Sequence, residues 1–411
     1  MDRQLKRQLR GLVLEEMDLS KNLTDDEILE LIDSTIIQKS RDHYIDLKEK
    51  SALRWEIFNS LRRLDVLQEL VEDREITEIM INGAAHVFYE KNGRISRWEK
   101  GFESEERLFD VIQQIVSRAN RIVNEASPIV DVCLEDGSRV NIVLPPIALD
   151  GAVVTIRKFP ETPIDMNTLV QLHSLTQEVA DFLRSLVEAK YNIFISGGTG
   201  SGKTTFLNAL SNFIPEDERV ITIEDSAELQ IRKIPNLVRL ESRNANLEGK
   251  NQVTIRDLIR SAMRMRPDRI IVGEVRDAAV IDMIQAMNTG HDGSISTGHS
   301  NSPKDMITRL ETLYLMGMEI PLVAVRKQIA SAVDIIVHLG RLRDKTRRVL
   351  EIDEVLEGHD GEVQLNPLFQ FAESGQKADG TVVGQLIRTT NQMQHTEKLM
   401  RAGMIERKVI V

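Results

Sequence analysis

The stretch Tyr191–Thr205 reads YNIFISGGTGSGKTT. An apolar run of strand length leads into a loop that satisfies the pattern G-x-x-x-x-G-K-[ST]. In such a loop the glycines let successive backbone N–H groups point at phosphates, the lysine neutralises phosphate oxygens, and the hydroxyl after it can bind Mg²⁺. An apolar helix, FLNALSNFI, follows and would direct its N-terminus at the phosphates. We therefore predict a site for ATP and Mg²⁺, rather than a glycine-rich turn, formed by Gly197, Gly198, Thr199, Gly200, Ser201, Gly202, Lys203, Thr204 and Thr205.

The alternation of strand, loop and helix continues beyond this motif. Further apolar runs of strand length occur in RVITIED, RIIVGEV, SISTGH and DIIVHL, with helical segments between them. This alternation predicts an α/β domain whose largely parallel sheet is covered by helices on both faces. Two later stretches, RRVLEIDEVLEG and EVQLNPLFQF, are typical of a hairpin appended to that sheet.

The first part of the chain has a different pattern. In ALRWEIFNSLRRLDVLQELV, apolar residues from Leu53 to Leu70 recur at helical spacing and predict a core-facing stripe. From Ile76 onward, short apolar runs alternate with Asn-Gly turns, and a predicted helix over Ser104–Ala119 is followed by more strands. We therefore predict a helical N-terminal extension (1–75), an α+β domain (76–160), a linker (161–170), the nucleotide-binding domain (171–372) and a polar C-terminal tail (373–411).

Composition narrows the class of protein. The 411 residues are 41% apolar and 28% charged, which is typical of soluble globular domains. The formal net charge of -11 disfavours non-specific binding of nucleic acid. Cys133 is the single cysteine, so intramolecular disulfides and cysteine zinc sites are excluded. No apolar run approaches the roughly 20 residues of a membrane helix, and we expect a cytoplasmic protein.

The strand in RIIVGEVRD, Arg269–Asp277, ends without the carboxylate that many ATPases use to help hold Mg²⁺. Gly273 occupies that place and Glu274 follows it. Because the apolar run buries this strand up to the ligand-binding edge, we predict that Glu274 is catalytic and orients the attacking water. The alternative is a surface acid paired with Arg276.

Another acidic pair follows the first strand after the P-loop helix. RVITIEDSAEL places Glu224 and Asp225 at the C-terminal end of that strand, the edge that faces the ligand in parallel α/β sheets. We predict that Glu224 and Asp225 share with Thr204 the task of holding Mg²⁺, partly through water.

Histidines and arginines supply the remaining candidates. His291 and His299 flank the strand SISTGH, but neither their spacing nor any cysteine supports a zinc site. His299 falls at the ligand-binding edge, where we expect it to contact the γ-phosphate. Arg139 and Arg157 lie on strands of the first domain, and we expect them to approach the nucleotide of the second domain or of a neighbouring subunit.

Together these motifs resemble the CpaF family, also called TadA, of the type II/type IV secretion ATPase superfamily. The resemblance runs from ITEIMINGAAHVFYEKNGRI through GGTGSGKTT and VITIEDSAELQI to QIASAVDIIVHLGRLRD, residues 76–344. Its most specific part is RMRPDRIIVGEVR followed by AMNTGHDGS.

The resemblance implies a homohexameric ring of subunits, each with an N-terminal sensor-like domain and a C-terminal RecA-like ATPase domain. It implies an Asp box in EDSAE, a Walker B strand with glycine before Glu274, and a His box formed by His291 and His299. It also implies that Arg139 and Arg157 approach the nucleotide, that Glu224 approaches the metal, and that Lys203 takes part in hydrolysis.

The function that the resemblance implies is ATP hydrolysis that powers Flp/Tad-type pilus assembly or protein secretion. The partner would be an inner-membrane platform protein, giving peripheral attachment to the membrane, and no nucleic-acid partner is expected. A conjugative type IV secretion ATPase stays open as an alternative. So do a nucleic-acid-translocating RecA-like motor and a nucleotide sensor that does not hydrolyse ATP.

Overall fold

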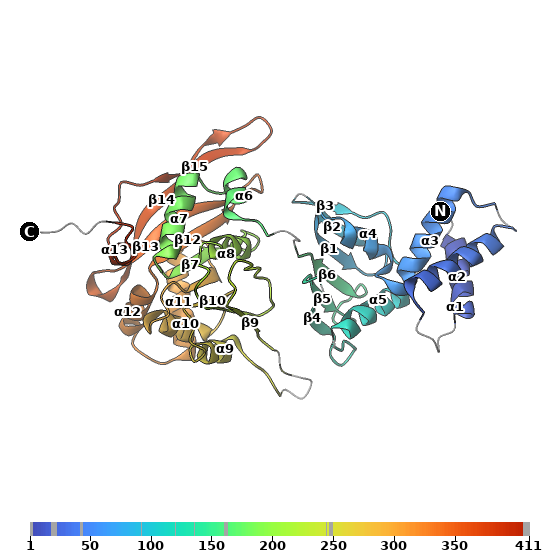
Figure 1. Cartoon of the computed structure of the whole chain (residues 1–411), viewed down its shortest axis with the longest axis horizontal. Coiled ribbons are helices and arrows are strands. Elements are labelled where there is room, and N and C mark those ends of the chain that lie inside the picture. The colour runs from blue at the N-terminus through green and yellow to red at the C-terminus, as the bar shows by residue number, and fades with distance from the viewer. Residues whose placement is uncertain are drawn as a thin grey trace, which may run out of the picture. The chain divides into compact units, whose positions relative to one another are not determined.

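The computed structural model describes residues 3–17, 23–41, 44–91, 93–119, 121–134, 136–159, 163–243, 245 and 250–405. The chain forms two compact units, Met1–Pro160 and Glu161–Val411, each with hydrophobic cores of its own (Figure 1). No helix within the described ranges is both long enough and apolar enough to cross a membrane.

The first unit begins with three helices: α1 (Arg3–Glu16), α2 (Asp25–Lys39) and α3 (Leu47–Arg62). Thr24 and Asp46 cap α2 and α3 by accepting hydrogen bonds from backbone N–H groups of the first turn. Their apolar faces share a small core that contains Leu9, Val13, Ile28, Ile32, Ile36, Ile45, Leu53, Ile57 and Phe58. The helical character predicted for this region is therefore confirmed.

The predicted stripe from Leu53 to Leu70 does not form one helix. Asp65 has a positive φ of 52°, which ends helical propagation after α3 and starts the short helices η1 (Asp65–Leu67) and α4 (Gln68–Glu72). The buried Asp65 carboxylate is held by Arg107 Nε at 2.7 Å. As a result, Leu53 packs in the helical core whereas Leu70 packs in the core of the following sheet.

The rest of the first unit is the predicted α+β fold. Its antiparallel sheet has the order β3-β2-β1-β6-β5-β4. Ser104 caps α5 (Glu105–Arg118), whose buried face packs on the sheet, and this helix is one residue shorter at each end than predicted. The strands are β1 (Ile76–Asn82), β2 (Val87–Lys91), β3 (Arg94–Arg97), β4 (Ile129–Cys133), β5 (Arg139–Val143) and β6 (Val153–Arg157).

The second unit is built on a nine-stranded sheet with the order β15-β14-β13-β12-β7-β11-β10-β8-β9 among its described residues. Neighbours from β12 to β9 run parallel, and β13, β14 and β15 extend the sheet with antiparallel pairs. The strands are β7 (Ile193–Gly197), β8 (Val220–Glu224), β9 (Leu237–Glu241), β10 (Arg269–Val272), β11 (Ile295–His299), β12 (Ile335–Arg341), β13 (Arg347–Glu357), β14 (Val363–Gln376) and β15 (Val382–Arg388).

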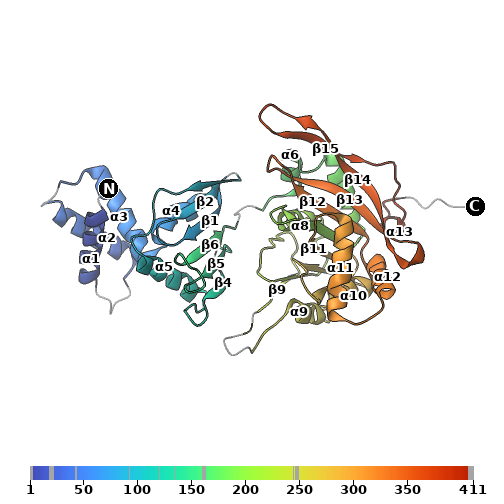
Figure 2. The same cartoon turned by 180° about the vertical axis from the view of Figure 1, so that it is seen from behind.

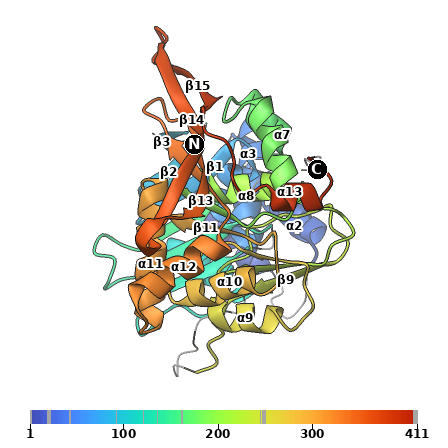
Figure 3. The same cartoon turned by 90° about the vertical axis from the view of Figure 1, so that its left-hand side faces the viewer.

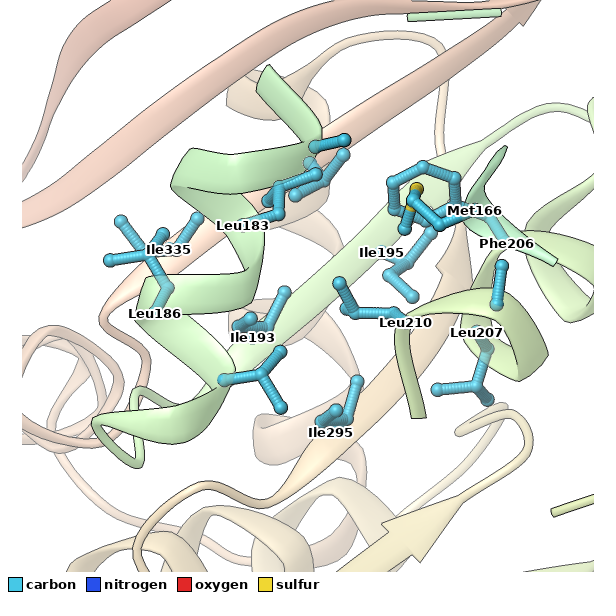
Figure 4. Packing of buried hydrophobic residues seen from close by; sticks show 14 of the residues in the cluster. Met166, Leu183, Leu186, Ile193, Ile195, Phe206, Leu207, Leu210, Ile295 and Ile335 are labelled. Carbon is cyan, nitrogen blue, oxygen red and sulfur yellow. The ribbon is translucent and has the colours of Figure 1, made fainter. Parts of the chain in front are cut away.

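Helices cover both faces of the parallel part of this sheet. On one face pack α6 (Met166–Gln171), α7 (Gln177–Glu188) and α8 (Lys203–Ser211), as Figures 1 and 4 show. On the other face, seen in Figure 2, pack α9 (Ile255–Ala262), α10 (Ala279–Asn288), α11 (Pro303–Gly317) and α12 (Leu322–Ala332). Every residue of β7 and β8 is buried, as expected for strands covered on both faces, and this confirms the predicted α/β class.

Several predicted boundaries need correction. Met166 and Leu169 of α6 are buried in the core of the second unit, so the second half of the predicted linker belongs to that fold. The predicted hairpin is present, but β14 continues past residue 372 and pairs with β15, which the sequence analysis missed (Figure 3). The short helix α13 (Glu397–Arg401) packs Leu399 into the same core. The stretch predicted as a polar tail therefore includes part of the sheet.

Candidate nucleotide site

The P-loop connects β7 to α8 through backbone conformations that favour glycine. Gly197, Gly200 and Gly202 have φ values of 155°, 70° and 95°. A Cβ on Gly197 would lie only 2.4 Å from the carbonyl oxygen of Leu339 and 2.6 Å from Oγ of Ser201. A residue with a side chain at 197 would therefore displace the loop from the neighbouring strand.

The beginning of α8 is suited to an anion. Its N-cap residue is Gly202, and no side chain caps the first turn. Ser201 is buried, and its Oγ has no hydrogen-bond partner within the described part of the chain. Lys203 Nζ donates to the carbonyl oxygens of Gly197 and Gly198, at 3.0 and 2.9 Å, and so brings its charge over the loop. An uncapped helix N-terminus with a lysine beside it fits a phosphate group.

The order of the strands places the other candidates in a row beside the P-loop. β11, which ends at His299, lies next to β7, and β10, which leads to Glu274, lies next to β11. β8, which ends at Glu224, comes after β10. The strand that follows the P-loop helix in sequence is thus separated from the P-loop strand by β11 and β10. Glu224 is therefore at the same edge of the parallel sheet as the P-loop, but not on a strand next to it.

A continuous line of polar side chains runs across these strand ends. Lys203 Nζ lies 3.3 Å from His299 Nδ1, and His299 Nε2 lies 3.1 Å from Glu274 Oε1. On its other side, Glu274 Oε2 accepts a hydrogen bond from Arg276 Nη2 at 2.7 Å. The predicted pairing of Glu274 with Arg276 is therefore present. It does not make Glu274 a surface acid, since its side chain is only 18% exposed.

The two ends of this line differ in their surroundings. Burial lowers the pKa of His299 below its ordinary value, and the positive charge of Lys203 acts in the same direction. At neutral pH the imidazole is therefore mainly uncharged between the P-loop lysine and Glu274. Glu274 Oε1 is buried and receives no well-aligned hydrogen bond from the described residues, so it has a free acceptor for a water molecule.

A cavity of about 200 Å³ adjoins Glu274 on the side of β8 and α9. Its lining includes Asp225, Arg243, Thr254, Glu274 and Arg276. Glu274 therefore lies between His299, which contacts the P-loop lysine, and a cavity with room for several water molecules.

The carboxylates of Glu224 and Asp225 both accept hydrogen bonds from other residues of the chain. Glu224 Oε2 accepts hydrogen bonds from the backbone N–H groups of Glu228 and Leu229, at 2.7 and 2.8 Å. Burial raises the pKa of Glu224 to about 7, although these two hydrogen bonds act in the opposite direction. Asp225 is exposed and accepts a hydrogen bond from Ser242 Oγ at 2.7 Å.

Thr204 is half-buried at the second position of α8. This is the P-loop position whose hydroxyl would bind Mg²⁺. In the described ranges no three His, Cys, Asp or Glu side chains gather as a metal site on their own. Bound Mg²⁺ would supply positive charge that stabilises the charge developing on the phosphates. The roles of Glu224 and Asp225 toward this ion stay predictions.

The remaining candidates lie away from this row. His291 is at the opposite end of β11, where its Nδ1 lies 3.3 Å from the carbonyl oxygen of Ala286. Arg139 and Arg157, in the first unit, are direct cross-strand partners on β5 and β6. The structure therefore brings these two arginines together, and their approach to a nucleotide stays a prediction.

One contact to the P-loop was not predicted from the sequence. Arg347, at the start of β13, donates from Nε to the carbonyl oxygen of Gly200 at 2.8 Å. Its only signal in the sequence is a pair of arginines in a predicted hairpin, which is equally typical of a solvated turn.

The P-loop follows a central strand of a parallel sheet that is covered by helices on both faces, and a largely buried acid, Glu274, follows a strand two positions away. This arrangement defines a P-loop ATPase with a RecA-like fold. Within that class, the family described as Type II/IV secretion system protein matches residues 61–403, and the chain belongs to this family.

Named relatives agree with this assignment. The chain is 35% identical over 298 residues to conjugal transfer protein TrbB of Rhizobium radiobacter, covering 70% of this chain and 86% of that protein. It is 32% identical over 349 residues to type IV secretion system protein VirB11 of Brucella suis biovar 1, covering 77% and 93%. The crystal structure of the pilus retraction motor PilT with ADP shares the fold, with a TM-score of 0.52 and 18% identity over 84% of this chain and 88% of that one.

Proposed function

We propose that this ATPase works as a homohexameric cytoplasmic motor that hydrolyses ATP to ADP and phosphate. The energy of ATP hydrolysis would drive Flp/Tad-type pilus assembly or protein secretion through an inner-membrane platform protein. ATP and Mg²⁺ would bind at the P-loop. In this proposal Glu274 orients the attacking water, Lys203 and His299 contact the γ-phosphate, and Arg139 and Arg157 complete the site from the first unit.

The observation that carries the catalytic part is the position of Glu274. One carboxylate oxygen, Oε2, is fixed by Arg276, while Oε1 lies beside His299 and has no well-aligned donor within the described residues. His299 in turn lies beside the P-loop lysine. A carboxylate that is held on one side and has a free acceptor on the other is suited to orient water.

A second candidate pathway is supported by the relatives. Those reported above include a conjugal transfer protein and a type IV secretion protein, so a conjugative type IV secretion ATPase is supported as well as a Tad pilus ATPase. Both pathways would use the same site for ATP hydrolysis, and they differ in the partner protein that the ATPase drives. The pilus proposal rests on the helical extension α1–α3, nearly all of which precedes the residues that the family matches.

Replacing Glu274 by Gln tests the catalytic proposal. The substitution preserves size and removes the charge, so we expect ATP binding to survive and hydrolysis to fall by about 10²–10³-fold. Glu319→Gln, an exposed acid on the α11–α12 connection, is the matched control and should leave turnover unchanged. Equal loss of binding and hydrolysis in Glu274→Gln would show a structural role instead.

The pathway is tested in the source cell. Deleting the gene should abolish surface pili or secretion if the pilus proposal is right, and should abolish DNA transfer to a recipient if the conjugative alternative is right. Stimulation of ATP turnover by polynucleotides would instead favour a nucleic-acid motor.

A further inference from the structure

The hairpin of β12 and β13 lies directly beside the P-loop. β12 runs parallel to β7, with Leu339 opposite Gly197. The two strands of the hairpin are joined by a tight turn, and the first pair next to this turn is Arg341 opposite Arg347. Directly opposite residues project from the same face of an antiparallel pair, so the two exposed arginine side chains are neighbours.

Both arginine side chains reach the P-loop. Arg347 Nε donates to the carbonyl oxygen of Gly200 at 2.8 Å, and its Cδ would lie 3.4 Å from a Cβ on Gly202. Arg341 Nη1 would lie 4.0 Å from a Cβ on Gly200. Two guanidinium groups from one hairpin therefore lie against the middle of the phosphate-binding loop.

The charge of this pair is not neutralised by any acid in the described part of the chain. Neither Arg341 nor Arg347 forms an ion pair with any residue that the structure describes. By contrast, Arg343 in the same turn pairs with Glu373 at 2.5 Å. Asp344, the acid of the turn, already accepts hydrogen bonds from Thr346 and from the N–H of Val382. Like charges directly opposite each other destabilise a hairpin, so this arrangement favours the arrival of an anion.

The strand order indicates which part of a nucleotide the pair would meet. β7 lies between β12 and β11, and the row of His299 and Glu274 lies on the side of β11. The γ-phosphate and the attacking water belong on the side of Glu274. The arginine pair lies on the opposite side of the loop, where the α- and β-phosphates continue toward the rest of the nucleotide.

We propose that Arg341 and Arg347 form a cationic clamp on the α- and β-phosphates of the bound nucleotide. Arg347 also stabilises the P-loop by its hydrogen bond to the carbonyl oxygen of Gly200, while Lys203 donates to the carbonyl oxygens of Gly197 and Gly198. This inference rests on the proposed use of the P-loop for ATP and adds a second set of nucleotide-binding residues to it.

Binding of ADP and of a non-hydrolysable ATP analogue to the full chain, measured by titration calorimetry, tests the clamp. Arg341→Gln and Arg347→Gln should each raise the Kd of both nucleotides by about 5- to 10-fold, as expected for losing one charge-assisted contact that is partly exposed to solvent. Arg343→Gln is the matched control, because it removes the same charge from the same turn, and its Kd should stay within about 2-fold of the wild type. Equal effects of Arg341→Gln and Arg343→Gln would overturn the proposal, as would a loss confined to the ATP analogue.

Thermal unfolding separates a binding role from a structural one. Without nucleotide, Arg341→Gln should unfold at or above the wild-type temperature, because the substitution relieves repulsion with Arg347. With saturating ADP its stabilisation should be smaller than that of the wild type. A lowered unfolding temperature without nucleotide, together with an unchanged shift on adding ADP, would overturn the clamp.

Lys203→Ala distinguishes failure of the clamp from failure of the nucleotide site. If Lys203→Ala loses nucleotide and Arg341→Gln binds normally, only the clamp is wrong. If Lys203→Ala itself binds ADP and the ATP analogue like the wild type, the P-loop site is wrong and the clamp falls with it.

Discussion

Gly273 and Glu224 lie against each other at the ends of neighbouring strands, such that a Cβ on Gly273 would be 3.1 Å from Cγ of Glu224. This contact gives a physical reason for the glycine that replaces the familiar carboxylate. Any side chain at 273 would press on Glu224 and disturb its hydrogen bonds to the N–H groups of Glu228 and Leu229. The glycine therefore allows a buried glutamate to occupy the space beside β10.

The first prediction concerns Lys203. Its ammonium group touches two carbonyl oxygens of the P-loop and lies beside His299. Lys203→Ala removes this charge from the phosphate site, so we expect ATP hydrolysis to be abolished and the ADP-induced rise in unfolding temperature to disappear. Lys304→Ala, an exposed lysine in the first turn of α11, is the control and should retain both. Wild-type turnover in the Lys203→Ala protein would contradict the assignment.

The second prediction concerns Asp353 on β13, which is only 1% exposed. Burial, with a smaller contribution from the charge of Glu351, raises the pKa of Asp353 to about 8. The folded state therefore keeps the proton that the unfolded chain loses near pH 3.8, the ordinary pKa of an aspartate. The stabilisation from this protonated carboxyl is complete below pH 3.8 and is lost as pH rises to about 8.

Asp353→Asn removes this titration. Between pH 5.5 and 7.5 the wild type should lose roughly 2–3 kcal/mol of unfolding free energy that the variant does not lose. Denaturant unfolding at several pH values measures the difference. Asp217→Asn, at an exposed position, should follow the wild-type pH dependence. Parallel curves for the wild type and Asp353→Asn would show that Asp353 is ionised in the folded protein.

Local signals in the sequence predicted the parts of the fold that depend on neighbouring residues. The P-loop and the helix over Ser104–Ala119 were predicted in this way, and Ser104 does cap α5. The edge strands β9 and β15 were missed because neither has a buried apolar run: β9 has no fully buried residue, and most residues of β15 are exposed. The contact between Gly273 and Glu224 could not be predicted, because it depends on the order of strands in the sheet.

A third prediction concerns the contribution of the first unit. Arg139 and Arg157 lie outside the unit that carries the P-loop. A fragment beginning at Ile164 retains the packing of Ile164 and the cap that Asp165 provides for α6, so we expect it to fold and bind ATP. Without the two arginines it should hydrolyse ATP poorly. Full-length Arg139→Gln and Arg157→Gln should show the same loss of turnover with binding retained, and a fragment as active as the full chain would contradict this prediction.

The last prediction returns to Glu224 and the magnesium ion. Because the oxygen of a glutamine can still accept hydrogen bonds from the N–H groups of Glu228 and Leu229, Glu224→Gln removes the charge and leaves the loop in place. If the carboxylate helps to hold Mg²⁺ through water, the variant should need several-fold more magnesium for half-maximal hydrolysis. Asp225→Asn should have a smaller effect, since Asp225 is exposed and bound to Ser242.

Gly273→Asp in the Glu224→Gln background decides whether position 273 can substitute for Glu224. We expect no rescue, because the new Cβ would lie 3.1 Å from Cγ at position 224 and push that side chain away from the loop. Magnesium titrations of ATP hydrolysis in the single and double variants measure this. A titration of Glu224→Gln that overlays the wild type would remove Glu224 from the metal site and leave Thr204 and the phosphates as its supports.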